Sequence, residues 1–210
     1  MSSNIRDQFP QLHRQVNGTP LCYLDSGASS LKCKATIDAV TDIYTNGYSN
    51  IHRGIHTIGG EITSKYENAR SQVASFLNAS SANEIVFTRS GTEAINLVAA
   101  TWGKQSIQAG DSICISALEH HANIVPWQQL CTAKNAKLIV LPLNAEKTNL
   151  DYVTAEKLII EHTPKLIAIS HLSNVLGCLV DIQKIKTTAS KVGAKWLVDG
   201  CQAIARTPVD

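Results

Sequence analysis

The sequence predicts an α/β fold built on a mostly parallel sheet, and two observations predict it. From residue 84 onward, short β-branched runs alternate with longer helix-like stretches, which is the pattern of strands joined by crossover helices. The runs are apolar at consecutive positions, as strands covered on both faces should be. The predicted strands are "EIVFT" (84–88), "SICIS" (112–116), "KLIVLPL" (137–143), "KLIAIS" (165–170) and "AKWLVD" (194–199).

Helix-like stretches fill the intervals between these strands. The segments "KNAK" (134–137) and "KVGAK" (191–195) supply the helix stops and turns that such an arrangement needs. The predicted helices are "TEAINLVAATWGK" (92–104), "ANIVPWQQLCTAKNA" (122–136), "DYVTAEKLIIEH" (151–162) and "DIQKIKTTASKVG" (181–193).

The first 80 residues follow a different pattern. The segment "PLCYLDSGASS" (20–30) predicts a short strand and a turn, whereas residues 32–48 and 59–78 predict two helices. Between these helices, "SNIHRGIHTIGG" (49–60) is polar and rich in glycine, which is typical of a loop.

The charge and the cysteine pattern exclude several classes of protein. The formal net charge is only +2, with scattered Lys and Arg, which argues against a nucleic-acid-binding protein. No apolar run has the length of a membrane span, and the start of the sequence lacks the apolar core of a signal peptide. The six cysteines include no Cys-x-x-Cys pair, so we expect reduced thiols in a cytoplasmic protein.

Candidate chemistry lies where the strands end, because ligands of an open parallel sheet bind at the carboxyl ends of its strands. The segment "RSGTEA" (89–94) offers small residues and the start of a helix, which suits a phosphate group, although the same residues also serve as ordinary helix caps. The segment "HLSNVLG" (171–177) places an imidazole, a hydroxyl and an amide after the strand at 165–170.

Glu119, His120 and His121 follow the strand at 112–116 and allow three interpretations: a metal site, an acid/base site or a solvated turn. Adjacent side chains point in different directions, and no second cluster of Cys, His or carboxylate residues has the spacing of zinc ligands. The sequence therefore predicts no metal site and leaves the other two interpretations open.

Asp199 ends the apolar strand at 194–199, where a carboxylate is costly to desolvate without a cationic partner. It could cap the next helix or pair with a protonated heterocycle. Together, the strand exits offer a phosphate cradle, a flat imidazole, an amide and a carboxylate. A phosphorylated pyridine needs this set, with the carboxylate keeping the ring nitrogen protonated.

These residues carry a resemblance to a known family. The chain resembles the SUF-type (group II) cysteine desulfurases of the class V aminotransferase family, which have the pyridoxal 5'-phosphate (PLP) fold-type I. The matching stretches run in the family's order over nearly the whole chain. They are "YLDSGASS", "GYSNIHRGIHT", "ANEIVFTRSGTEAINLVA", "ISALEHHANIVPWQ", "LPLN", "HLSNVLG" and "GAKWLVDGCQA".

The resemblance implies that the chain forms a truncated large domain of the three-layer PLP-transferase fold-type I. Residues 1–80 would form an amino-terminal helical segment with active-site loops, and residues 81–210 a partial PLP-binding domain. In this family the first strand of the large domain pairs with the last one, which is antiparallel and would lie beyond Asp210. We therefore expect "EIVFT" to lie apart from a block formed by the other four predicted strands.

The resemblance also implies a role for each site residue. His120 would stack on the pyridine ring and help proton transfer, which makes it the catalytic residue, while His121 would be structural. The other cofactor-binding residues would be Ser90, Gly91 and Thr92 at the phosphate, Asp199 at the ring nitrogen, and Asn174 and Gln202 near the phenolic oxygen. Substrate-binding residues would be Ala28, His52, Arg53 and Asn174.

Two features depart from the family's pattern. Ser90-Gly91-Thr92 stands where the family often has Gly-Thr-Thr, and Cys201 stands where it usually has alanine. The chain also contains no lysine in the Ser-Gly-His-Lys context that forms the Schiff base, no cysteine that matches the family's nucleophile, and none of its later substrate-binding arginine. It therefore resembles the amino-terminal half of a longer enzyme and is not expected to be active alone.

The implied reaction converts L-cysteine to L-alanine and leaves the sulfur as an enzyme-bound persulfide. A sulfur-acceptor protein would then take the sulfur for iron–sulfur cluster assembly, and the full-length protein would be a homodimer. Two alternatives remain open: a selenocysteine lyase of the same fold, acting on L-selenocysteine, and a non-catalytic truncated binding or dimerisation module. A nucleotide-binding Rossmann protein is disfavoured, because no Gly-x-Gly-x-x-Gly follows any predicted strand.

Overall fold

The computed structural model describes residues 5–209 and divides the chain into two compact units. One unit extends to Val86 and the other from Phe87 to Val209, and each is described by itself. The boundary predicted from the sequence separates residues 1–80 from residues 81–210, and that division into domains stays a prediction.

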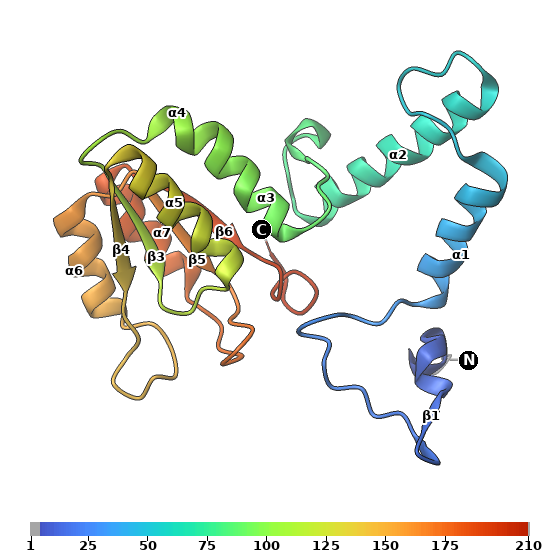
Figure 1. Ribbon diagram of the computed structural model, residues 1–210, viewed down its shortest axis with the longest axis horizontal. Coiled ribbons are helices and arrows are strands. Elements are labelled where there is room, and N and C mark those ends of the chain that lie inside the picture. Colours follow the sequence, from blue (N-terminus) through green and yellow to red (C-terminus); the bar gives the residue numbers. More distant parts are fainter. Residues whose placement is uncertain (1–4, 210) are drawn as a thin grey trace. The chain divides into compact units, whose positions relative to one another are not determined.

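A four-stranded parallel sheet forms the centre of the second unit (Figure 1). Its strands are β3 (Ser112–Ser116), β4 (Lys137–Leu141), β5 (Leu166–Ser170) and β6 (Lys195–Asp199), in the order β4-β3-β5-β6. All three strand pairs are parallel. The predicted block of four strands is therefore confirmed.

The predicted strand at residues 84–88 is wrong. Ala82–Glu84 form a short 3-10 helix, η4, and residues 85–88 are extended without strand pairing. Val86 and Phe87 are 67% and 42% exposed. Strand propensity reports how well a side chain packs on a neighbouring strand, so β-branched residues without such a neighbour form no strand. As expected, this segment is not part of the four-strand block.

The helices of the second unit lie where the sequence predicts them: two precede β3, and the other three connect successive strands. They are α3 (Gly91–Val98), α4 (Lys104–Ser106), α5 (Val125–Lys134), α6 (Tyr152–His162) and α7 (Ile182–Val192). The first predicted helix is divided, since a π-helical stretch, η5 (Ala99–Gly103), joins α3 to α4. Asp151 and Asp181 cap the starts of α6 and α7 through their side chains. Gly193 ends α7 at φ 68°, a left-handed conformation that glycine adopts without strain.

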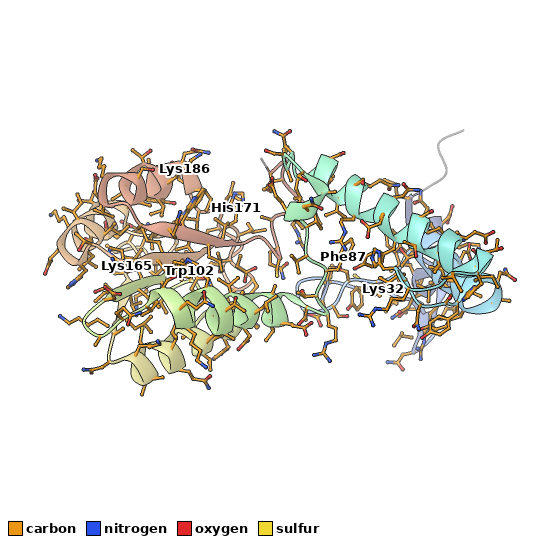
Figure 2. All side chains as sticks on the ribbon, turned by 90° about the horizontal axis from the view of Figure 1, so that it is seen from above. Lys32, Phe87, Trp102, Lys165, His171 and Lys186 are labelled. Carbon is orange, nitrogen blue, oxygen red and sulfur yellow. The ribbon has the colours of Figure 1, made fainter. Side chains whose placement is uncertain are left out.

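The sheet lies between two helical layers, and alternate strand residues face opposite layers. Ile113 and Ile115 of β3 belong to the core under α3 and α5, together with Trp127. Cys114 of the same strand belongs to the core under α6 and α7, together with Ile185. Figure 2 shows the two layers on either side of the sheet, with Trp102 marking the segment after α3 and Lys186 marking α7. The unit thus has three layers.

The first unit is mostly helical and buries few side chains. Its helices are α1 (Lys34–Asp42) and α2 (Thr57–Phe76), and α1 continues into a π-helical stretch, η3 (Ile43–Gly47). Two 3-10 helices, η1 (Ile5–Gln8) and η2 (Pro10–His13), precede a short antiparallel pair, β1 (Gln15–Val16) and β2 (Thr19–Pro20). The strand predicted within residues 20–30 is limited to Pro20, and a turn follows at 26–28.

Among residues 5–209, no helix combines the length and the apolar character needed to cross a membrane.

Candidate functional site

The candidate site lies at the carboxyl edge of the sheet, where β3, β5 and β6 end side by side. Ser170 of β5 pairs in register with Asp199 of β6. The backbone N–H of His171 donates to the carbonyl of Asp199 at 3.0 Å. On the other side of β5, the Glu119 carboxylate accepts the backbone N–H of Ser170 at 2.9 Å. The exits of three strands are therefore joined directly by hydrogen bonds, and Figure 2 labels His171 at the middle exit.

Ser90, Gly91 and Thr92 begin helix α3 next to this edge. Ser90 is the N-cap, and its hydroxyl accepts the backbone N–H of Glu93 at 3.2 Å. The first turn leaves the amides of Gly91 and Thr92 without intrahelical acceptors, and Thr92 is exposed. Capping and anion binding are therefore compatible here, because the Ser90 cap uses the amide of Glu93 and leaves the amides of Gly91 and Thr92 for an anion.

Cys201 lies against this helix start. A Cβ atom added to Gly91 would lie 2.5 Å from Cys201 Sγ, so any other residue at position 91 would force the Cys201 side chain to move. The contact brings the turn after β6 to the start of α3. Burial, and next the neighbouring Asp199 carboxylate, raise the pKa of the Cys201 thiol to about 11. The thiol is thus protonated at neutral pH, which makes it a poor nucleophile.

Asp199 is partly buried at the end of β6. Its Oδ1 accepts the backbone N–H of Cys201 at 2.9 Å, so one of its oxygens stabilises the turn that follows. Among residues 5–209, it forms no salt bridge with a Lys, Arg or His. A protonated ring nitrogen is the kind of partner that such a carboxylate lacks.

His120 caps a short 3-10 helix, η6 (His121–Asn123), at the exit of β3. Its Nδ1 accepts the backbone N–H of Ala122 at 3.1 Å, so the neutral ring carries its proton on Nε2. The ring is exposed and stands edge-on to His121, with centroids 6.0 Å apart and an interplanar angle of 86°. The two rings are therefore perpendicular and cannot both lie flat against one ligand.

Asn174 and Gln202 lie in the loops after β5 and β6. The loop at 171–180 is closed by a bridge between Leu172 and Leu179, and the Ser173 hydroxyl accepts the backbone N–H of Leu176 at 3.2 Å. Asn174 is exposed in this loop, whereas Gln202 is partly buried in the turn after Asp199. Both residues are thus on the same edge as Asp199.

Ala28, His52 and Arg53 belong to the other compact unit and are described separately from the strand exits. His52 has a positive φ of 63°, and its Nε2 lies 3.2 Å from Glu67 Oε1. Ala28 and Arg53 are exposed. Their part in the site stays a prediction.

Glu119 is the site residue that the sequence did not assign. It was visible as the acid before two histidines, but its partners Ser170 and Asn123 could be found only from the fold. No group of metal-ligating side chains exists among residues 5–209. The groups at this edge fit PLP: helix-start amides for a phosphate, an exposed imidazole for a ring face, and a carboxylate that forms no salt bridge among the described residues for a ring nitrogen.

Comparisons with known proteins agree with this chemistry. The family model for class-V aminotransferases matches residues 22–210. A cysteine desulfurase of Shigella sonnei is 52% identical over 206 residues, which is 98% of this chain and 50% of that protein. The chain therefore spans about half the length of the curated relatives that it matches.

Solved structures also resemble the chain over about half of their own length. The cysteine desulfurase CsdA of Escherichia coli has a TM-score of 0.83 and 36% identity, covering 98% of this chain and 50% of that one. The apo cysteine desulfurase of Thermococcus onnurineus has a TM-score of 0.88 and 33% identity, covering 98% and 48%. The predicted fold is thereby confirmed, and the chain belongs to the class-V aminotransferase family, with cysteine desulfurases among its relatives.

Proposed function

We propose that this chain forms the PLP-cradling half of a cysteine desulfurase. One observation carries the proposal: the His120 ring and the Asp199 carboxylate follow β3 and β6 at one edge of the sheet, and the start of α3 lies against the turn after β6. The contact between Gly91 and Cys201 links the start of α3 to the turn after Asp199. The Glu119–Ser170 hydrogen bond links the segment that carries His120 to β5. Relatives named cysteine desulfurase support the same reaction.

When bound, PLP supplies an electron sink that stabilises negative charge at the substrate Cα. In this proposal Asp199 accepts the N–H of the pyridine nitrogen and keeps that nitrogen protonated, using the oxygen that does not hold Cys201. The amides of Gly91 and Thr92, with the Thr92 hydroxyl, bind the phosphate at the positive end of the α3 dipole.

His120 covers one face of the ring and excludes water from it. Its Nδ1 is occupied by the Ala122 N–H, so Nε2 is the atom that could hold or move a proton. Asn174 and Gln202 would donate to the phenolic oxygen of the cofactor, and Asn174 also to the substrate carboxylate. His52, Arg53 and Ala28 would line the mouth of the substrate site.

The substrate proposed is L-cysteine, and the products are L-alanine and a sulfur atom held as a persulfide on a cysteine. Burial raises the pKa of Cys114 to about 12 and also raises that of Cys131, so neither thiol is suited to that role. The motifs "HRGIHT" and "EHHANIVPW" support the SUF-type branch. We propose with it a cytoplasmic homodimer that passes sulfur to an acceptor protein of iron–sulfur cluster assembly.

The experiment is a fluorescence titration of the 210-residue chain with pyridoxamine 5'-phosphate. This probe has the ring and phosphate of the cofactor but no aldehyde, so it cannot react with surface lysines. We expect saturable binding that Asp199→Asn weakens about 10-fold, since a hydrogen bond to a charged group is lost. Asparagine keeps the oxygen that accepts the Cys201 N–H, so the turn is retained. Equal binding by both forms would contradict the role of Asp199.

A further inference from the structure

The Glu119 carboxylate is the centre of a hydrogen-bond network that the roles above do not use. Its Oε1 accepts the backbone N–H of Ser170 at 2.9 Å and the hydroxyl of Ser116. Its Oε2 accepts the Ser170 hydroxyl at 2.7 Å and Asn123 Nδ2 at 2.7 Å. Ser116 accepts the backbone N–H of Leu118 at 3.1 Å, which leaves its own proton for Glu119. All the groups that bind Glu119 are therefore donors, and an ionised carboxylate is the side chain that can satisfy them.

Asn123 extends this network around His120. It is fully buried, its Oδ1 accepts Trp127 Nε1 at 2.8 Å, and its backbone N–H donates to the His120 carbonyl at 2.8 Å. The hydrogen bond between the Glu119 and Asn123 side chains thus joins the residue before His120 to the turn after it. The hydrogen bonds from Ser170 to the Glu119 carboxylate join this turn to β5. The backbone that presents the His120 ring has little freedom to move.

We propose that Glu119 is a positioning residue that acts through His120, holding the imidazole at the height and tilt at which it covers the cofactor ring. The proposal rests on the proposed function, because it assumes that His120 stacks on PLP. Glu119 itself needs no contact with cofactor or substrate for this role. Its importance comes from joining the exit of β3 to that of β5.

Glutamine cannot replace Glu119, although it has the same shape. If its amide nitrogen takes the place of Oε1, it faces the Ser170 N–H, which cannot reverse. If it takes the place of Oε2, it faces the Asn123 amide nitrogen. Asn123 cannot turn over without presenting an N–H to the Trp127 N–H. Either way, two donors meet in a partly buried site.

The exchange of both groups removes this conflict. In the double variant Glu119→Gln/Asn123→Asp, the glutamine amide donates to one oxygen of the new aspartate, and the other oxygen still accepts Trp127 Nε1. The Ser170 hydroxyl can rotate to accept the amide. The negative charge moves to position 123, but the network is complete again.

The test is the affinity of the dilute 210-residue chain for pyridoxamine 5'-phosphate in two backgrounds. Glu119→Gln should weaken binding about 10-fold in the parent chain. His120→Asn removes the ring but keeps an N-cap oxygen for the Ala122 N–H. In that background, Glu119→Gln should cause no further loss, because the ring through which it acts is absent. The double exchange should restore binding to within about threefold of the parent. Glu156→Gln, which breaks an exposed ion pair with Lys191 in the same unit, is the matched control and should change nothing.

Three results would overturn the inference, and they differ from one another. Equal losses from Glu119→Gln in both backgrounds would mean a general structural effect and would leave the proposed function intact. Failure of the double exchange to restore binding would mean that the network geometry is not the cause. A parent chain that binds no pyridoxamine 5'-phosphate would contradict the proposed function itself, and the role of Glu119 with it.

Discussion

At the scale of single residues, the two adjacent histidines differ in orientation. His120 accepts the Ala122 N–H and caps η6, while the His121 ring stands perpendicular to it. We expect His120→Asn to weaken binding of pyridoxamine 5'-phosphate about 10-fold and His121→Asn to leave it unchanged, because stacking on a ring is worth 1 kcal/mol or somewhat more. Fluorescence titration measures both, and equal losses would contradict the choice of His120.

The cysteine thiols should differ in reactivity according to their surroundings. The Thr36 side chain and backbone lower the pKa of Cys33, whereas burial raises that of Cys114 to about 12, and burial together with the Asp199 carboxylate raises that of Cys201 to about 11. A lowered pKa gives more thiolate at pH 8, so Cys33 should alkylate before Cys201, and Cys114 only after unfolding. Iodoacetamide labelling followed by peptide mass spectrometry checks this order. Labelling of Cys114 along with Cys33 in the native chain would show that the core is not closed.

At the scale of elements, the start of α3 and the turn after β6 depend on each other. We expect Gly91→Ala to destabilise the chain by about 1 kcal/mol, because the new methyl group would overlap Cys201 Sγ. Cys201→Ala removes that sulfur, so the double variant should recover the lost stability. Urea unfolding of the four forms measures the coupling. If the loss is the same with and without the sulfur, the contact is not its cause.

The elements also show where sequence patterns were sufficient. The strands β3, β4, β5 and β6 were predicted because each is an apolar run between helix signals, and each has a partner in the sheet. The run at 84–88 is also rich in β-branched and apolar residues, but within residues 5–209 no strand pairs with it, and it forms no strand. A hydrophobic run favours burial, whereas strand pairing is a property of two segments.

At the scale of the whole molecule, the sheet has two strands, β4 and β6, that each pair on one side only within residues 5–209. Large apolar side chains are also exposed, including Leu24 at 90%, Ile55 at 105% and Val175 at 79%. Open strand edges and apolar surface favour association, so we expect the chain to aggregate as its concentration is raised. Light scattering over a dilution series checks this, and a monodisperse monomer at high concentration would contradict it.

The same chain should bind PLP without a specific covalent bond. Its site supplies a helix start, an imidazole and a carboxylate, and no lysine has the family's Schiff-base context. After treatment with PLP and borohydride, we expect scattered, substoichiometric labelling of surface lysines. A stoichiometric reduced adduct mapped by mass spectrometry to one lysine would show that the chain carries its own Schiff-base residue.

The sequence by itself determined the α/β class, four strands with their helices, and the family, because these depend on local periodicity and on motifs of neighbouring residues. Only the tertiary structure decided which distant groups meet. The bonds from Glu119 to Ser170 and the contact of Gly91 with Cys201 join residues far apart in the chain. The order β4-β3-β5-β6 brings them together, and no local pattern encodes that order, because the pairing of strands is settled by the packing of the whole sheet.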